Sequence, residues 1–214
     1  MTEFLLSVAA FIAAHVLPAF PRARGALVRR LGERTYLILY SGLSLALLIW
    51  LGFAFQGAPV IELWPQTQWA RWLPALVMAV ACPLLIGGLF AANPFSLTFS
   101  RKIFDADRPG LIGLVRHPVF WATGLWAAVH IPVNGEAVPV ILFSLLLLLS
   151  LYGPRALAAK RRKSMDEADW RQLTGQRRSF RGANGWPAGI LGGGALYLLL
   201  LYVHQAVIGV SPWP

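Results

Sequence analysis

The stretch "RHPVFWATGLWAAVHIPVNGEAVPVILFSLLLLLSLYGPR", residues 116–155, begins and ends on arginine and is almost free of charge between them. Two apolar runs, 118–133 and 137–153, are separated by "NGE", residues 134–136, which is typical of a tight turn. Apolar runs without Asp, Glu, Lys or Arg are typical of helices that cross a bilayer, where one crossing takes ~20 residues. We therefore predict two antiparallel membrane helices joined by this turn.

The rest of the chain repeats this pattern of apolar runs between basic segments. Further runs of suitable length cover residues 3–20, 35–55, 73–92 and 188–210. The chain of 214 residues is 57% hydrophobic and 13% charged, with a mean hydropathy of +0.60, which is far more apolar than a soluble domain. We expect an all-α, polytopic membrane protein with about six transmembrane helices, forming a single integral membrane domain over residues 1–214.

The distribution of basic residues predicts the orientation of the chain. The segments 21–34, 93–117 and 154–187 contain all but one of the 19 Lys and Arg residues, and the exception is Arg71. The positive-inside rule places these three segments in the cytoplasm and both termini outside. The net charge of +10 on so apolar a chain indicates a lipid bilayer with anionic head groups as the partner, and we expect no nucleic acid.

Two further segments have distinctive patterns. Residues 155–181 alternate basic and apolar side chains, so we expect an amphipathic helix along the membrane surface. Gly189 and Gly193 stand at a spacing that lets two helix backbones approach closely, and we expect helix packing there.

Histidines are the ionisable residues within the apolar runs. His15, His130 and His204 lie inside predicted membrane helices, and His117 lies at the start of one. An ionisable group at membrane depth is a candidate functional residue. Counting along the helices allows His15 to pair with His130 near the midplane, or His130 with His204 in the outer half. Either pair would suit the two faces of a haem, whereas the simpler alternative is hydrogen bonding between helices.

The segment 93–117 is a second candidate site. It is long, carries charges of both signs and ends in Arg116 and His117. Long loops of this kind are often functional, and arginines at a membrane surface bind anionic head groups or phosphate-bearing ligands. The alternative is that these arginines act as topology signals alone.

Two stretches resemble a known family: "AAHVLPAFPRARGALVRRLGERTYLILYSGLSL", residues 13–45, and "RHPVFWATGLWAAVHIPVNGE", residues 116–136. Together with the basic segment that follows, they resemble the NnrU family of bacterial membrane proteins over about residues 1–185, before the last span at 188–210. That family is linked to nitrite and nitric oxide metabolism in denitrification and is related to the plant and cyanobacterial 15-cis-zeta-carotene isomerase. The resemblance implies a six-helix, multi-pass protein of the bacterial inner membrane. With the orientation that the basic segments predict, both termini lie on the periplasmic side.

The isomerase branch of that resemblance implies a cofactor. It binds haem b and uses the iron to isomerise a double bond of a lipophilic polyene. Its first-helix histidine matches His15, its fourth-helix histidine matches His130, and the histidine of its "RHP" motif matches His117. The resemblance thus implies haem b held by His15 and His130, with Arg116 and His117 at the cytoplasmic mouth and a polyene or nitric oxide as the reaction partner. His204 has no counterpart in this family.

Two other functions remain open. The "RHP" block also resembles the isoprenylcysteine carboxyl methyltransferases, in which a similar motif contributes to an S-adenosylmethionine pocket. The matching acidic stretch would be "MDEADWRQLTGQRRSF", residues 165–180, with Glu167 in the acidic position. The tyrosines of the methyltransferase stretch are missing here, and a further span follows. A non-enzymatic haem or sensor-like accessory protein would have the same histidines but no substrate pocket.

Overall fold

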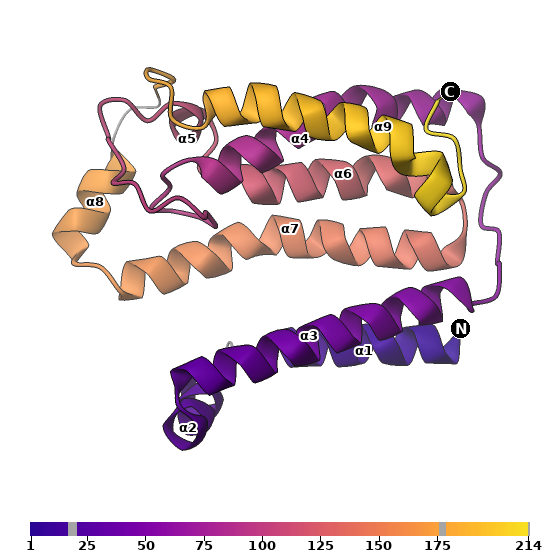
Figure 1. Ribbon diagram of the computed structural model, residues 1–214, viewed down its shortest axis with the longest axis horizontal. Coiled ribbons are helices and arrows are strands. Elements are labelled where there is room, and N and C mark those ends of the chain that lie inside the picture. Colours follow the sequence, from indigo (N-terminus) through magenta and orange to yellow (C-terminus); the bar gives the residue numbers. More distant parts are fainter. Residues whose placement is uncertain (17–20, 176–178, 214) are drawn as a thin grey trace. The chain divides into compact units, whose positions relative to one another are not determined.

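The computed structural model describes residues 1–16, 21–175 and 179–213, and within these ranges the regular elements are all helices (Figure 1). Some helices are long and apolar enough to cross a membrane: α3 (Glu33–Gln56), the continuous segment of η2 (Gln68–Arg71) and α4 (Trp72–Phe90), α7 (Ala137–Lys163), and the continuous segment of η3 (Ala188–Gly193) and α9 (Gly194–Ile208). The prediction of an all-α, multi-pass membrane protein is confirmed.

The count of about six membrane helices stays a prediction. Among the described residues, four helices meet the length and hydropathy that a crossing requires. The other two predicted spans correspond to shorter helices, α1 (Thr2–Val16) and α6 (Pro118–Asn134). The last four residues of the expected first span, 17–20, lie outside the described residues.

The chain divides into two compact units. The first unit contains residues 1–62 and 136–138, and the second contains residues 63–135 and the chain from 139 onward. The expectation of a single integral membrane domain stays a prediction.

In the first unit, large side chains join α1 to α3. Phe4 and Val8 of α1 are buried, and the ring of Phe4 meets the ring of Phe55 on α3 edge to face, with 6.3 Å between the centroids. The hydroxyl of the buried Ser7 donates to the carbonyl of Phe4 at 2.8 Å, so that it has a partner within an apolar contact.

The basic segment after α1 contains a helix that the sequence pattern did not predict. Residues 21–34 were expected to be a cytoplasmic loop, but α2 (Pro21–Leu31) is an amphipathic helix. Proline is a favoured first residue of a helix because its missing N–H has no partner in the first turn. Gly32, with φ 77°, separates α2 from α3, and this backbone conformation favours glycine.

In the second unit, small residues bring helices together. Helices α4, α6 and α9 lie side by side (Figure 1). A Cβ atom on Gly189 would lie 2.8 Å from the carbonyl oxygen of Pro83, and one on Gly193 would overlap the backbone of Pro83. The predicted close packing at Gly189 and Gly193 is confirmed, because their missing side chains let η3 and the start of α9 touch α4.

The turn between α6 and α7 is also confirmed. Gly135 ends α6 in the left-handed conformation, with φ 65°. The indole Nε1 of Trp64 donates to the carbonyl of Pro132 at 3.1 Å, and a Cβ on Gly135 would overlap the carbonyl oxygen of Trp64. The turn therefore requires glycine for its backbone conformation and for this contact.

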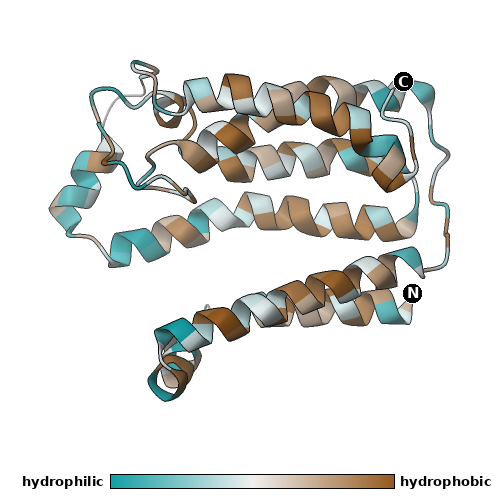
Figure 2. Cartoon of the chain, viewed as in Figure 1, coloured by the Kyte–Doolittle hydropathy of each residue, from teal (hydrophilic) through white to brown (hydrophobic). Residues whose placement is uncertain are grey.

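The segment expected to form one interfacial helix, 155–181, is divided. Its first part continues α7 to Lys163, and a separate helix, α8 (Glu167–Gly175), follows a short turn. A carboxylate oxygen of Asp166 accepts a hydrogen bond from the backbone N–H of Ala168 at 3.2 Å, which favours a new helix start at this point. Figure 2 shows α8 as hydrophilic and the middle of α7 as apolar. Residues 176–178 of the expected helix lie outside the described residues.

Candidate functional site

His15, His130 and His204 share one local arrangement. In each, ring atom Nδ1 lies 2.7 Å from a backbone carbonyl oxygen; the pairs are His15 with Phe11, His130 with Trp126, and His204 with Val210. A carbonyl oxygen only accepts hydrogen bonds, so Nδ1 carries the proton in each ring. In the neutral imidazole, Nε2 then holds the lone pair, which is the state that a metal ligand requires.

His15 also connects two helices of the first unit. Its Nε2 accepts a hydrogen bond from the Ser44 hydroxyl of α3 at 2.8 Å. The ring stacks on Phe11 at 4.2 Å and meets the edge of Tyr40 at 5.9 Å. A hydrogen bond between helices was the alternative to haem ligation for these histidines, and His15 forms such a bond. Ser44 lies in the middle of α3, about 17 Å along that helix from its start.

His130 has a different environment in the second unit. It lies one turn before the end of α6, and its ring is 5.8 Å from Trp126 and 5.0 Å from Phe143 of α7, measured between ring centroids. Among the described residues, no side chain or backbone group hydrogen-bonds to its Nε2. His130 therefore presents an unused lone pair beside two aromatic rings.

A polar lobe forms at one end of the second unit, where the basic segments 93–117 and 154–187 come together. We call this assembly of residues 91–117, α8 and residues 179–187 the basic lobe; it contains the short helix α5 (Leu111–Leu114) (Figure 1). Ala91, Phe95 and Ile112 are buried at its centre, and Phe104 and Leu173 pack against them.

Asn184 joins separate segments of the basic lobe. Its side-chain oxygen accepts from the backbone N–H of Ala92 at 2.9 Å. Its side-chain nitrogen donates to the carbonyls of Ala92 and Pro109 at 3.0 and 3.1 Å. Sequence reasoning missed this residue. The local signal was the dipeptide Asn184-Gly185, which is typical of a turn but does not predict partners so distant in sequence.

Asn93 forms a second junction that was also missed. Its side-chain oxygen accepts from the backbone N–H groups of Phe95 and Ser96, at 2.9 and 3.2 Å. Its side-chain nitrogen donates to the carbonyl of Arg116 at 3.0 Å. The turn after α4 is thereby held against the start of α6.

Arg116 and His117 lie together in the basic lobe. A guanidinium N–H of Arg116 donates to the carbonyl of Thr174 in α8 at 2.8 Å, and the group lies over the Phe95 ring at 5.1 Å. His117 is half-buried, and its Nδ1 has no hydrogen-bond partner among the described residues. Burial, with a smaller contribution from the Arg116 charge, lowers the pKa of His117. Arg116 thus holds α8 in place, and His117 is kept neutral beside it.

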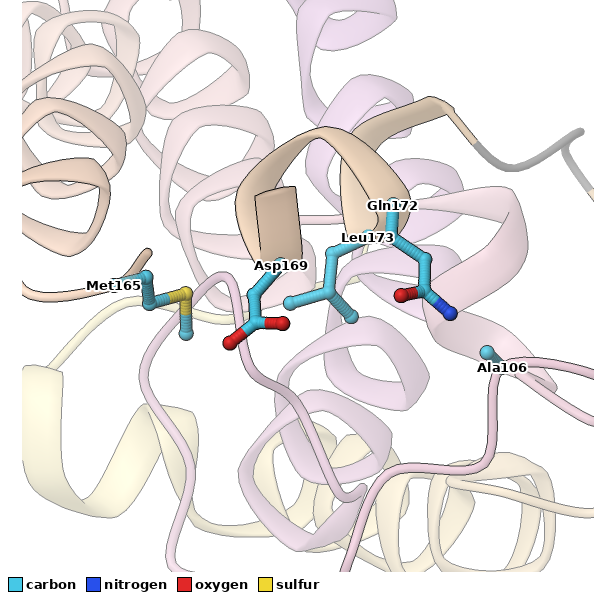
Figure 3. A pocket seen from close by; sticks show the side chains of 5 residues that line it. All are labelled: Ala106, Met165, Asp169, Gln172 and Leu173. Atoms are coloured by element: carbon cyan, nitrogen blue, oxygen red, sulfur yellow. The ribbon is translucent and has the colours of Figure 1, made fainter. Parts of the chain in front are cut away.

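A hollow of about 300 Å³ opens beside α8 (Figure 3). Asp169 and Gln172 supply its polar groups, and its other walls are Ala106, Met165 and Leu173. Glu167, which the methyltransferase resemblance placed in the acidic position, is instead bound to two arginines at the surface. Its distances to Arg162 and Arg171 are 3.2 and 3.0 Å, and these hydrogen bonds lower the pKa of Glu167.

The apolar helices and the basic lobe define a polytopic helical membrane protein. Comparison with protein families then identifies it further: the family model described as "NnrU protein" matches residues 3–212, so the chain belongs to the NnrU family. The match extends through the last helix, beyond the region over which the resemblance was first noted. Comparisons with curated proteins and with solved structures gave no match.

Proposed function

We propose that this NnrU protein binds haem b, which His15 and His130 would hold. The observation that carries the proposal is the hydrogen bond from each Nδ1 to the carbonyl four residues earlier, at 2.7 Å in both. Ligating histidines commonly donate their other ring N–H to a carbonyl, which fixes the ring and makes Nε2 more basic.

The donor set fits a haem better than a metal ion held by protein alone. Among the described residues, no group of three or more His, Cys, Asp or Glu side chains gathers closely enough to hold an ion. A haem requires from the protein only its axial ligands and an apolar surface. Phe11 and Tyr40 beside His15, and Trp126 and Phe143 beside His130, supply apolar surface at each ligand.

Each histidine would contribute differently. Within the described residues, the Nε2 of His130 is without a hydrogen bond, so ligation costs no existing contact. The Nε2 of His15 would exchange the Ser44 hydroxyl for the metal, which makes His15 the more easily displaced ligand. When bound, haem b would supply a redox-active iron able to interact with a polyene double bond or with nitric oxide.

The proposed orientation rests on the basic lobe. Both basic segments of the second unit come together there, joined by the bond from Arg116 to Thr174 and the bond from Gly110 N–H to the carbonyl of Arg181. In a bacterial inner membrane, the positive-inside rule assigns this end to the cytoplasm, with both termini periplasmic.

One introduced cysteine tests the orientation. Ile103 lies in the basic lobe and is 95% exposed, so a cysteine at this position is accessible to reagents. Ile103→Cys in a Cys82→Ala background should react with a membrane-impermeant maleimide in inverted vesicles and stay unlabelled in spheroplasts. The reverse pattern would place the basic lobe in the periplasm.

The experiment that tests haem binding is an absorption spectrum of detergent-purified protein, expressed with haem supply, before and after dithionite. We expect a stoichiometric Soret band and sharp reduced bands. His15→Gln and His130→Gln should each lower haem content, whereas His204→Gln should leave it unchanged. His130→Met keeps an axial donor and should shift the reduced bands rather than abolish them.

Other outcomes have distinct meanings. If His130→Gln and His204→Gln lose the band while His15→Gln keeps it, the ligands are the second pair. No Soret band in the unaltered protein, or unchanged haem in the His15 and His130 variants, would contradict the proposal. Circular dichroism and size-exclusion profiles of every variant separate loss of haem from loss of fold.

The hollow beside α8 favours a second candidate, an S-adenosylmethionine-dependent methyltransferase. Asp169 offers a carboxylate there, and Arg116 holds α8 through Thr174, which follows the lining residue Leu173. Titration calorimetry with S-adenosylmethionine tests this function. Loss of binding in Asp169→Asn but not in Glu167→Gln would support the hollow as the site, and absence of binding in the unaltered protein would exclude it.

A further inference from the structure

A second, apolar hollow lies wholly within the first unit. It measures about 210 Å³, and α1, α2 and α3 all contribute to its wall. Its lining is apolar apart from one guanidinium and two tyrosines; the residues that the argument uses are Ala23, Arg24, Leu27, Tyr36 and Tyr40. The cavity is therefore suited to hydrocarbon and has one cation in its wall.

Arg24 is held in place at this hollow. One guanidinium N–H donates to the Glu33 carboxylate at 3.2 Å, and the group lies over the Tyr36 ring, 5.6 Å from its centroid. An arginine has five N–H donors, and this contact uses one of them. The Arg24 side chain remains 44% exposed, so its other donors are accessible to an anion.

The remainder of α2 reinforces the positive charge. The helix contains Arg22, Arg24, Arg29 and Arg30 and no acidic residue. Helical spacing places Arg22 and Arg29 on the face opposite Leu27, which lines the hollow. A helix with this division lies in the interface of a membrane, with its apolar face toward the acyl chains. Arg24 then lies at the boundary between the hydrocarbon and the head groups.

We propose that the hollow between α1, α2 and α3 binds part of one acyl chain of an anionic phospholipid, whose phosphate is held by Arg24. The cavity wall is apolar, and apart from Glu33 the charged residues at its rim and along α2 are arginines. An acyl chain matches the wall and an anionic phosphate matches the arginines. Anionic lipids are abundant in the leaflet that basic segments face. The lining contains neither His15 nor His130, and Tyr40 is the residue that borders both this hollow and the His15 ring.

The experiment is native mass spectrometry of the full chain in detergent, titrated with phosphatidylglycerol or with phosphatidylcholine of the same acyl chains. Arg24→Gln should weaken phosphatidylglycerol binding about tenfold. The matched control is Arg22→Gln, which removes the same charge from the opposite face of α2 and should change binding less than about threefold. Ala23→Phe fills the hollow and should release the lipid.

Several results would overturn the proposal. Equal losses in Arg22→Gln and Arg24→Gln would mean that α2 attracts lipid by total charge alone. Both lipids contain a phosphate and differ in net charge, so equal binding of phosphatidylcholine and phosphatidylglycerol would contradict the selection for an anionic lipid. Displacement of the lipid by excess inorganic phosphate would mean that the acyl chain does not occupy the hollow. If Ala23→Phe fails to fold, the comparison of the two arginine variants still decides the question.

Discussion

The two units bring their helices together in different ways. In the first unit, α1 and α3 meet through large side chains such as Phe4 and Phe55, while Gly42 and Gly52 of α3 have open space where a Cβ would stand. In the second unit, Gly193 lies directly against the backbone of α4 at Pro83. Lipid tails are as apolar as leucine, so membrane helices gain little from burying apolar surface and depend on close fit. A glycine in such a helix is therefore essential only where another backbone occupies the space beside it.

The largest effect should come from filling that space. Gly193→Ala places a methyl group into the Pro83 backbone, and we expect a loss of about 2–3 kcal/mol in the free energy of unfolding. Gly42→Ala is the matched control in the first unit; it meets no atom within 4 Å and should be neutral or stabilising by up to about 1 kcal/mol. Thermal unfolding in detergent, followed by circular dichroism, measures both. Similar effects at the two positions would contradict the difference between the units.

A second prediction compares the polar connections of the two units. Asn184→Ala removes three hydrogen bonds from the basic lobe and should cost about 2 kcal/mol, because it leaves the N–H and the carbonyl of Ala92 without a partner among the described residues. Ser44→Ala removes one bond to His15 in the first unit and should cost about 1 kcal/mol. The same unfolding measurement applies. An Asn184→Ala loss no larger than that of Ser44→Ala would show that the lobe does not depend on this side chain.

The smallest predicted effect is a pH dependence at His117. Because the pKa of His117 is lowered in the folded protein, the unfolded chain binds its proton more readily, and stability falls as the pH drops below the unfolded value of about 6.5. The unfolding temperature should therefore decrease between about pH 7.5 and about pH 5.5. His117→Gln should reduce this slope. An equally steep slope in the variant would assign the pH dependence to other groups.

Local patterns predicted much of the fold. The apolar runs from 35 onward correspond to helices, the turn at 134–136 is present, and Gly189 and Gly193 form the expected close contact. The prediction failed at the starts of two helices, α2 and α8. The 21–34 segment contains α2, and a hydrogen bond to the Asp166 carboxylate divides the 155–181 segment. Helix starts depend on how single backbone N–H groups are hydrogen-bonded, which a hydropathy pattern does not reveal.

The residues of the candidate sites were also predicted only in part. Sequence reasoning selected His15 and His130 because ionisable residues are rare inside apolar runs. It selected Arg116 and His117 because they end the mixed-charge segment 93–117 and begin the "RHP" motif. It did not find Asn93 or Asn184, since asparagine is common in turns and its role here depends on partners such as Ala92, which lies 92 positions from Asn184. Nor did it predict that the Arg116 guanidinium would donate a hydrogen bond to the carbonyl of Thr174.

The amino-acid sequence by itself determined that this chain is a helical membrane protein of the NnrU family, with its basic residues gathered in three segments. Hydropathy and charge belong to each residue wherever it lies, so a count along the chain is enough to establish them. Tertiary structure decided which histidines keep a free Nε2 among the described residues, which glycines touch a backbone and which asparagines join the basic lobe. Those properties depend on atoms brought together from distant parts of the chain, and hydrogen bonds and steric contacts act only over a few ångströms.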